Sequence, residues 1–316
     1  MGVMKLLLAL LLACGTALGQ SHPRVFVVNK AGDSVTIVDA ASRRVDRMIP
    51  VGRNPHEIAA APDGTKLYVP NMAGNSVSVI DLRSQAETRT ITHPDFNAPH
   101  GVAFTPDSRR AIVTSERSRK IFILDTTTDQ IVRVVDTDQG GTHMVMVNSA
   151  GTQAYLTNRE SNTVSVMNLS DYRIVANIPV GRGAEGFAVS PDNKEVWVGN
   201  RNDSTISVVD LARRAAVATF PSGQNPIRLA FTPDGKHVLV PDGASRSVDV
   251  YEAAGRRKIQ SIAVGSNPGG IVVASDGKHA YVSSQGSGEL YVIETQGWKV
   301  VDRIMIGGGP DGVAYR

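Results

Sequence analysis

A repeated unit of about 42 residues is the feature of this sequence that most limits the folds open to it. A glycine recurs at the end of the unit, at Gly52, Gly181, Gly223, Gly265 and Gly307. The last three intervals are 42 residues each, and the interval from Gly52 to Gly181 is 129 residues, or three units of 43. Self-similarity at such a period indicates one repeat architecture rather than two ordinary domains.

Each unit contains four short runs rich in β-branched residues, separated by turn residues. In one unit they are Leu229–Thr232, His237–Pro241, Ser247–Tyr251 and Lys258–Val264. Such runs predict strands, and helical spacing is absent after residue 20. The first turn is Pro-Asp-Gly or a variant, as at Pro62-Asp63-Gly64, Pro106-Asp107-Ser108, Pro191-Asp192-Asn193, Pro233-Asp234-Gly235 and Ser275-Asp276-Gly277. Proline sets φ early in a tight turn, and the third residue accepts a positive φ.

The two ends of the chain determine the number of units. Six complete units run from about residue 53 to 307, and the N-terminal segment begins at a second strand, Val25–Asn29. Ser34–Asp39 and Arg44–Val51 follow it, whereas Gly312–Arg316 is a first strand with no successor. Joined, the two ends complete a seventh unit and leave no open sheet edge. We therefore predict an all-β, seven-bladed β-propeller over residues 20–316, with four-stranded antiparallel blades and both termini in blade one.

The first 19 residues have the pattern of an export signal. Lys5 gives the positive start, Leu6–Ala13 the apolar stretch, and Ala17-Leu18-Gly19 a cleavage site before Gln20. Eight apolar residues are too few to cross a bilayer, so we expect no transmembrane segment and a periplasmic or extracellular protein.

Cys14, the single cysteine of the chain, supports a second interpretation of the same segment. Leu11–Cys14 resembles a bacterial lipobox, in which Cys14 would be lipidated and would begin the mature chain. The soluble and the lipid-anchored forms both stay open. With one cysteine, no disulfide can form within the chain.

The charge pattern argues against nucleic acid as a partner. The chain has 33 basic and 30 acidic residues, a net charge of +3, and no extended run of Lys or Arg. It also lacks a Gly-rich phosphate loop, a CxxCH heme attachment sequence and a serine-hydrolase elbow. These absences disfavour nucleotide hydrolysis, c-type heme and a serine triad.

Several segments resemble the motif of the YVTN-repeat β-propeller family. The motif itself is matched at Leu67–Asn71, Ala154–Asn158 and Ala280–Ser284, and the rest of its consensus at Asn162–Val166 and Ile178–Gly181. The resemblance covers the mature chain and implies the propeller fold. The superfamily includes export-pathway binding proteins, archaeal surface-layer proteins and partners of quinoprotein dehydrogenases, while related folds include lactonases and heme-binding propellers. The function must therefore come from a site.

One position at the start of the innermost strand collects histidines and carboxylates. Around the predicted ring, this inner register reads Asp311, His56, His100, His143, Glu185, Ile227 and Gly269. Equivalent positions in neighbouring blades face the same axis, so three imidazoles and one or two carboxylates should converge. Such side chains suit Zn, Fe, Mn or Cu. We predict a divalent metal held by His56, His100, His143, Glu185 and Asp311, with a water-filled polar rim as the alternative.

Four cations are predicted on the same face. Lys30, Arg159 and Arg201 follow the second strand of their units, and Arg228 lies beside Ile227. Arginine recognises carboxylate and phosphate groups with a planar fork, which predicts an anion site. In the alternative interpretation they are exposed loop cations paired with neighbours such as Glu160 or Asp203.

These residues support three functional hypotheses. The first is an exported, monomeric binding scaffold for a protein partner or a small anionic ligand, with a bound metal. The second is a metal-assisted lactonase or lyase, in which Glu185 or Asp311 is the general base and Arg228 holds the anionic group; Pro99–Phe104 resembles a lactonase segment. The third is binding of a heme or quinone intermediate during cofactor delivery.

Overall fold

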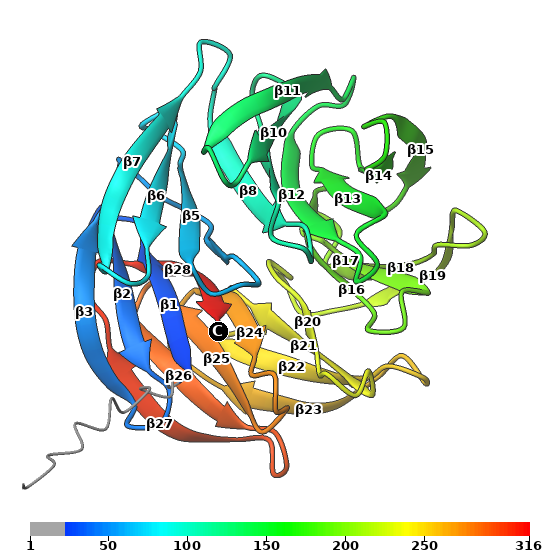
Figure 1. Ribbon diagram of the computed structural model, residues 1–316. Coiled ribbons are helices and arrows are strands. Elements are labelled where there is room, and N and C mark those ends of the chain that lie inside the picture. The colour runs from blue at the N-terminus through cyan, green and yellow to red at the C-terminus, as the bar shows by residue number, and fades with distance from the viewer. Residues whose placement is uncertain (1–22) are drawn as a thin grey trace, which may run out of the picture.

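The computed structural model describes residues 23–316, which form seven four-stranded antiparallel sheets without a helix among the described residues. The sheets are arranged in a ring around a central axis (Figure 1), and we call the space along this axis the channel. The predicted signal peptide, Cys14 and the cleavage site before Gln20 lie outside the described residues. Within residues 23–316, no helix is long and apolar enough to cross a membrane.

Every blade has one strand at the channel and three further strands outside it. From the channel outward, blade one consists of β28 (Pro310–Tyr315), β1 (Arg24–Asn29), β2 (Ser34–Asp39) and β3 (Arg44–Pro50). Blade two consists of β4 (Ala59–Ala60), β5 (Lys66–Asn71), β6 (Ser76–Asp81) and β7 (Ala86–Thr92). Blade three consists of β8 (Pro99–Phe104), β9 (Arg110–Ser115), β10 (Lys120–Asp125) and β11 (Gln130–Asp136). Blade four consists of β12 (Thr142–Val147), β13 (Gln153–Asn158), β14 (Thr163–Asn168) and β15 (Ile174–Pro179).

The remaining three blades have the same order. Blade five consists of β16 (Ala184–Val189), β17 (Glu195–Asn200), β18 (Thr205–Asp210) and β19 (Ala215–Pro221). Blade six consists of β20 (Ala230–Phe231), β21 (His237–Asp242), β22 (Ser247–Glu252) and β23 (Arg257–Ala263). Blade seven consists of β24 (Pro268–Val273), β25 (His279–Ser284), β26 (Glu289–Glu294) and β27 (Lys299–Met305).

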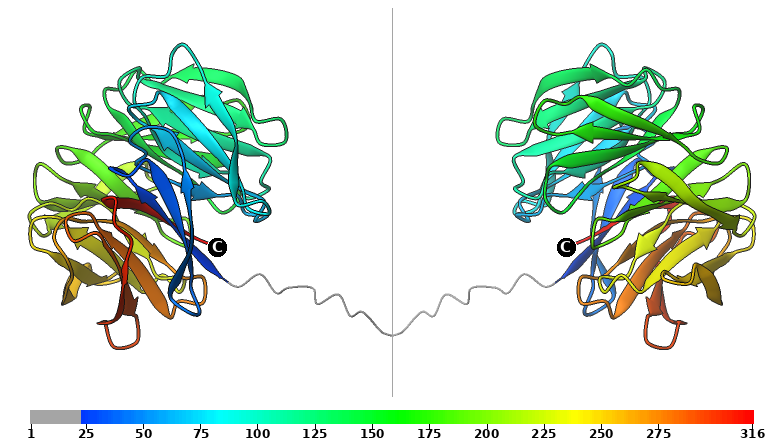
Figure 2. Two further views of the ribbon diagram at one scale, coloured as in Figure 1. Left: turned by 90° about the vertical axis from the view of Figure 1, so that its left-hand side faces the viewer. Right: turned by 90° about the vertical axis from the view of Figure 1, so that its right-hand side faces the viewer.

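The ring closes in blade one, as the two ends of the sequence predict. Strand β28 pairs antiparallel with β1, with Val27 opposite Val313. Arg24 and Arg316 exchange two backbone hydrogen bonds of 2.6 and 2.9 Å. Figures 1 and 2 show the last strand beside the first one. The closure supplies the inner strand that the N-terminal segment lacks.

The strands and turns of the repeat are confirmed, with one difference. The third residue of each Pro-Asp-Gly-like turn has a positive φ between 57° and 74°, from Asn193 to Gly64. The predicted strand Leu229–Thr232, however, is reduced to Ala230–Phe231. The other strands of that unit differ from prediction only at their ends.

The hydrophobic core is divided among the interfaces between blades. Seven apolar clusters each join two neighbouring blades, so both faces of every blade are buried. Trp197 of blade five, for example, packs with Leu229 and Val238 of blade six. Burial on both faces explains the nearly continuous apolar runs in the middle strands. The wedge-shaped packing leaves the polar ends of the inner strands at the channel.

Candidate functional site

All seven inner-register residues line one cavity of about 220 Å³ at the end of the channel where the inner strands begin. We call this end the channel mouth. The residue that follows the second strand of each blade forms a second set, the loop register, which reads Lys30, Met72, Glu116, Arg159, Arg201, Gly243 and Gln285. Six of these residues also line the cavity, all except Gly243. The structure therefore brings the predicted histidines, carboxylates and cations to one place.

One backbone hydrogen bond connects the two registers in every blade. The loop-register N–H donates to the carbonyl two residues before the inner-register residue, at distances of 2.9 to 3.2 Å. The N–H of Glu116 donates to Ala98, for example, and that of Arg159 donates to Gly141. The repeated bond sets both registers at the same depth in the channel.

In blades three and four, the Thr next to the last residue of the second strand, which in blade four is Thr157 of the YVTN-like segment, positions the inner register of the following blade. Thr114 Oγ1 accepts a 2.8 Å bond from the N–H of Gly101 and donates a 2.6 Å bond to the carbonyl of His143. Thr157 bonds in the same way to the carbonyl of Glu185, at 2.7 Å. A Cβ on Gly101 would lie 2.6 Å from the His143 carbonyl, so glycine permits this close approach.

The inner-register side chains form a continuous row of contacts. The His56 and His100 ring centroids are 4.9 Å apart, and those of His100 and His143 are 3.7 Å apart. At one end Asp311 Oδ2 lies 3.4 Å from His56 Nδ1, and at the other Glu185 Oε1 lies 3.2 Å from His143 Nε2. The predicted convergence of the five side chains is thus present as a row.

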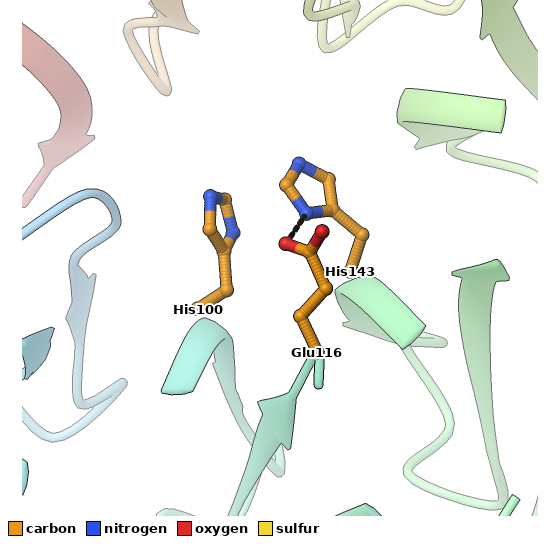
Figure 3. A group of neighbouring side chains, drawn as sticks. All are labelled: His100, Glu116 and His143. Atoms are coloured by element: carbon orange, nitrogen blue, oxygen red, sulfur yellow. Dashed lines mark hydrogen bonds and ion pairs between the residues drawn. The ribbon is translucent and has the colours of Figure 1, made fainter. Parts of the chain in front are cut away.

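Among residues 23–316, one group of three side chains could hold a metal ion: His100, Glu116 and His143. One ligand atom from each lies within 4.8 Å of the others. Figure 3 shows Glu116, from the end of β9, reaching up beside the two rings. His56, Glu185 and Asp311, the other predicted ligands, lie outside this group. His100 is 2% exposed, and its Nδ1 has no hydrogen-bond partner among the described residues.

His143 lies between two carboxylates. Its Nδ1 is 2.9 Å from Glu116 Oε2, and its Nε2 is 3.2 Å from Glu185 Oε1. Burial opposes a charged ring, but the carboxylates of Glu185 and Glu116 outweigh it and raise the pKa of His143. Burial likewise opposes the charge of Glu185, yet His143 and the nearby guanidinium groups lower the pKa of that carboxyl. A charged hydrogen-bonded chain therefore crosses blades three to five.

His56 and Asp311 have the opposite character. Burial, together with Lys30 and Arg228, lowers the pKa of His56 to about 3. Burial raises the pKa of Asp311, although Arg228 and Lys30 act against it. Asp311 is thus a better proton acceptor than Glu185, whose pKa is lowered.

The loop-register cations contact channel carboxylates. Arg159 Nε lies 2.8 Å from Glu185 Oε2, and Arg159 Nη1 lies 3.4 Å from Glu116 Oε1. Arg201 Nη1 is 3.6 Å from Glu185 Oε1, and Lys30 Nζ is 3.9 Å from Asp311 Oδ2. Their partners are therefore at the channel mouth.

Arg228 is paired with a residue on the other side of the channel. Its guanidinium makes a buried ion pair with Glu57 of blade two and lies 3.7 Å from Glu185. Burial opposes its charge, but Glu57 and its neighbours raise the pKa of Arg228. Only 8% of its side chain is exposed, so little of it faces the cavity.

Glu116 and Glu57 are the functional candidates that the sequence analysis missed. Glu116 occupies the same register as Lys30 and Arg159, and a full alignment of that register contains the signal for it. Glu57 follows His56 as Arg228 follows Ile227, but no pattern in the sequence pairs blades two and six.

Comparison with known protein families identifies the family of this chain. The sequence profile of the family described as lactonase, 7-bladed beta-propeller, matches residues 49–260. This chain belongs to that family. The match spans His56, His100, Glu116, His143 and Glu185, whereas Asp311 lies beyond it. The finer resemblance to the YVTN-repeat family stays a prediction.

Solved structures agree on the fold. A chain titled Kuenenia stuttgartiensis hydrazine synthase has a TM-score of 0.78 and 23% identity, covering 85% of this chain and 92% of that chain. A functionally unknown protein from Desulfotomaculum acetoxidans DSM 771 has a TM-score of 0.80 and 13% identity, with coverages of 92% and 98%. No curated protein matches the sequence. At such low identities these similarities concern the fold alone.

Proposed function

We propose that this member of the lactonase propeller family binds one divalent metal ion at its channel mouth and uses the loaded cavity as a binding site for a small ligand. His100, Glu116 and His143 hold the metal. The observation that carries the proposal is the approach of their ligand atoms to within 4.8 Å of one another. Imidazole and carboxylate together suit Zn, Fe, Mn or Cu.

The unpartnered ring nitrogen of His100 supports the same assignment. A buried polar atom without a partner costs roughly 1–3 kcal/mol, and a metal ligand bond would remove that cost. A metal ion would also replace the proton between His143 Nδ1 and Glu116 Oε2, freeing both atoms as ligands. Glu185 on the other ring nitrogen would then orient His143, as carboxylates do beside metal-bound histidines.

Elemental analysis of the purified full-length protein tests the proposal. We expect about one equivalent of metal in the wild type and a large loss in His100→Gln and Glu116→Gln. His279→Gln is the matched control, because His279 lies in blade seven away from the cavity. His56→Gln separates the three-residue group from the five-residue prediction, since it should keep its metal. Equally low metal in the wild type and His100→Gln would refute the metal site.

Metal-assisted hydrolysis of a lactone is a second candidate, favoured by the family match and by Asp311. A bound divalent metal polarises a carbonyl group. Asp311 would accept a proton from the attacking water as the water oxygen bonds to the carbonyl carbon. It would then return that proton to the ring oxygen as the ring C–O bond breaks, so that a hydroxy acid forms. A panel of lactones and uronates assayed with Asp311→Asn and His100→Gln tests this candidate. If the wild-type protein turns over these compounds no faster than the two variants do, this candidate is eliminated.

We further propose that the protein is exported, on the basis of residues 1–19. Mass spectrometry of the mature N-terminus distinguishes a chain that begins at Gln20 from one that begins at a lipidated Cys14. An intact Met1 in protein from the native host would overturn export.

A further inference from the structure

We propose that the channel mouth is a metal-gated anion site, in which Arg159 and Arg201 receive a small oxyanion or carboxylate once the metal has bound. This inference rests on the proposed metal site, and it adds the class of ligand and the order of binding. Its basis is the distribution of charge and contacts around the cavity.

Without metal, the Lys and Arg side chains of the mouth equal its carboxylates in number, and the His143 ring lies between two of those carboxylates. Four cations, Lys30, Arg159, Arg201 and Arg228, lie among four carboxylates, Glu57, Glu116, Glu185 and Asp311. Every one of these cations has a carboxylate within 4.0 Å. An anion that enters this state must displace an existing ion pair, so we expect it to bind weakly.

A divalent metal changes this balance. With neutral imidazoles, the ion adds two positive charges and displaces the one proton held between His143 and Glu116, so the largely buried site gains positive charge, which is costly when unpaired. Glu116, now a metal ligand, gives up its ion pair with Arg159. Glu185 is then the carboxylate that faces Arg159, Arg201 and Arg228 together. Three guanidinium groups on one carboxylate leave donors free for a second anion.

Accessibility excludes Arg228 as a receiving residue. Side-chain type then favours Arg159 and Arg201 over Lys30, which is 28% exposed, because a guanidinium group binds an oxyanion with a planar fork. The side chains of Arg159 and Arg201 are 32% and 39% exposed, whereas that of Arg228 is 8% exposed. Arg159 also borders a neighbouring cavity of about 310 Å³ that contains Arg182. The mouth cavity of about 220 Å³ has room for roughly seven waters at their liquid volume. This space fits a phosphate-sized oxyanion or a short carboxylate.

Thermodynamic linkage makes the inference measurable. If the metal strengthens anion binding by some factor, the anion must strengthen metal binding by the same factor. Titration calorimetry of inorganic phosphate into the full-length protein, stripped with a chelator or loaded with one equivalent of Mn²⁺, gives the first factor. We expect phosphate to bind at least about tenfold more tightly to the loaded protein.

Two variants separate the receiving arginines from a general charge effect. Arg201→Gln should keep the metal content, because Arg201 contacts Glu185 and Asn225 outside the metal group. It should lose most of the increase in phosphate affinity that Mn²⁺ produces. Arg182→Gln should keep the gain in phosphate affinity, since Arg182 is exposed and paired with Asp203. Equal phosphate affinity with and without bound Mn²⁺ would overturn the gating alone. A protein that takes up no metal would overturn both this inference and the proposed function.

Discussion

Arg228 of blade six and Glu57 of blade two form a buried ion pair across the channel, with Arg228 Nε 3.0 Å from Glu57 Oε1. Both residues directly follow the inner register. In their blades, proline (Pro70 and Pro241) takes the place of the motif Thr. The inner strands β4 and β20 are also the two shortest among the described residues. A proline there cannot make the side-chain bond by which Thr114 holds its neighbours.

Breaking this pair should strongly destabilise the protein. Arg228→Gln leaves the Glu57 carboxylate buried without its main partner, and we expect a loss of about 3–5 kcal/mol in the free energy of unfolding. Glu57→Gln combined with Arg228→Gln should recover much of the loss, because no charge is then left alone. Urea denaturation of the two single variants and the double variant measures the coupling. Additive losses would show that the two residues do not act as a pair.

Thr114 should affect metal binding through the backbone of His143. Thr114→Val removes the bonds to Gly101 and to the His143 carbonyl, and we expect metal affinity to fall about tenfold. Ser283→Ala is the matched control, because Ser283 makes the same two bonds to Gly270 and Asp311 in blade seven. Competition with a chelating dye measures both affinities. An equal loss in the two variants would point to general destabilisation.

The stability of the metal-free protein should decrease as the pH falls from 7 to 4. Burial lowers the pKa of folded His56 to about 3 from an ordinary value of 6.5, so below pH 6.5 the unfolded chain takes up a proton that the folded chain excludes. The contribution of His56 to the free energy of unfolding is therefore fully present above pH 6.5 and is lost toward pH 3. The loss is on the order of 2–3 kcal/mol by pH 4. His56→Gln should show a smaller decrease in urea midpoint over this range. NMR titration of the His56 ring checks the cause, and a midpoint near pH 6.5 would contradict it.

Strand β28 should be indispensable for the folded ring. Deleting residues 308–316 removes the inner strand of blade one and leaves β1 with an unpaired edge. We expect loss of the cooperative thermal transition and association in size-exclusion chromatography. Full-length Asp311→Asn, which loses only the carboxylate, should stay folded. A truncated protein with an unchanged melting temperature would show that closure contributes little.

The sequence predicted more of the site's placement than of its chemistry. The register of His56, His100 and His143 followed from the repeat, because equivalent positions in adjacent blades face the same axis. The choice of Glu116 as the third member of the metal group did not, since it depends on how far a side chain reaches from another loop. The same is true of Arg228, predicted to hold an anionic group and found against Glu57.

By itself, the sequence determined the strands, the turns, the number of blades and the closure in blade one, because these depend on local pattern and on the period of the repeat. Only the tertiary structure decided which side chains meet: His143 with both Glu116 and Glu185, and Arg228 with Glu57. Such contacts join residues up to 171 positions apart. They depend on the packing angle between blades and on side-chain rotamers, which no local pattern encodes.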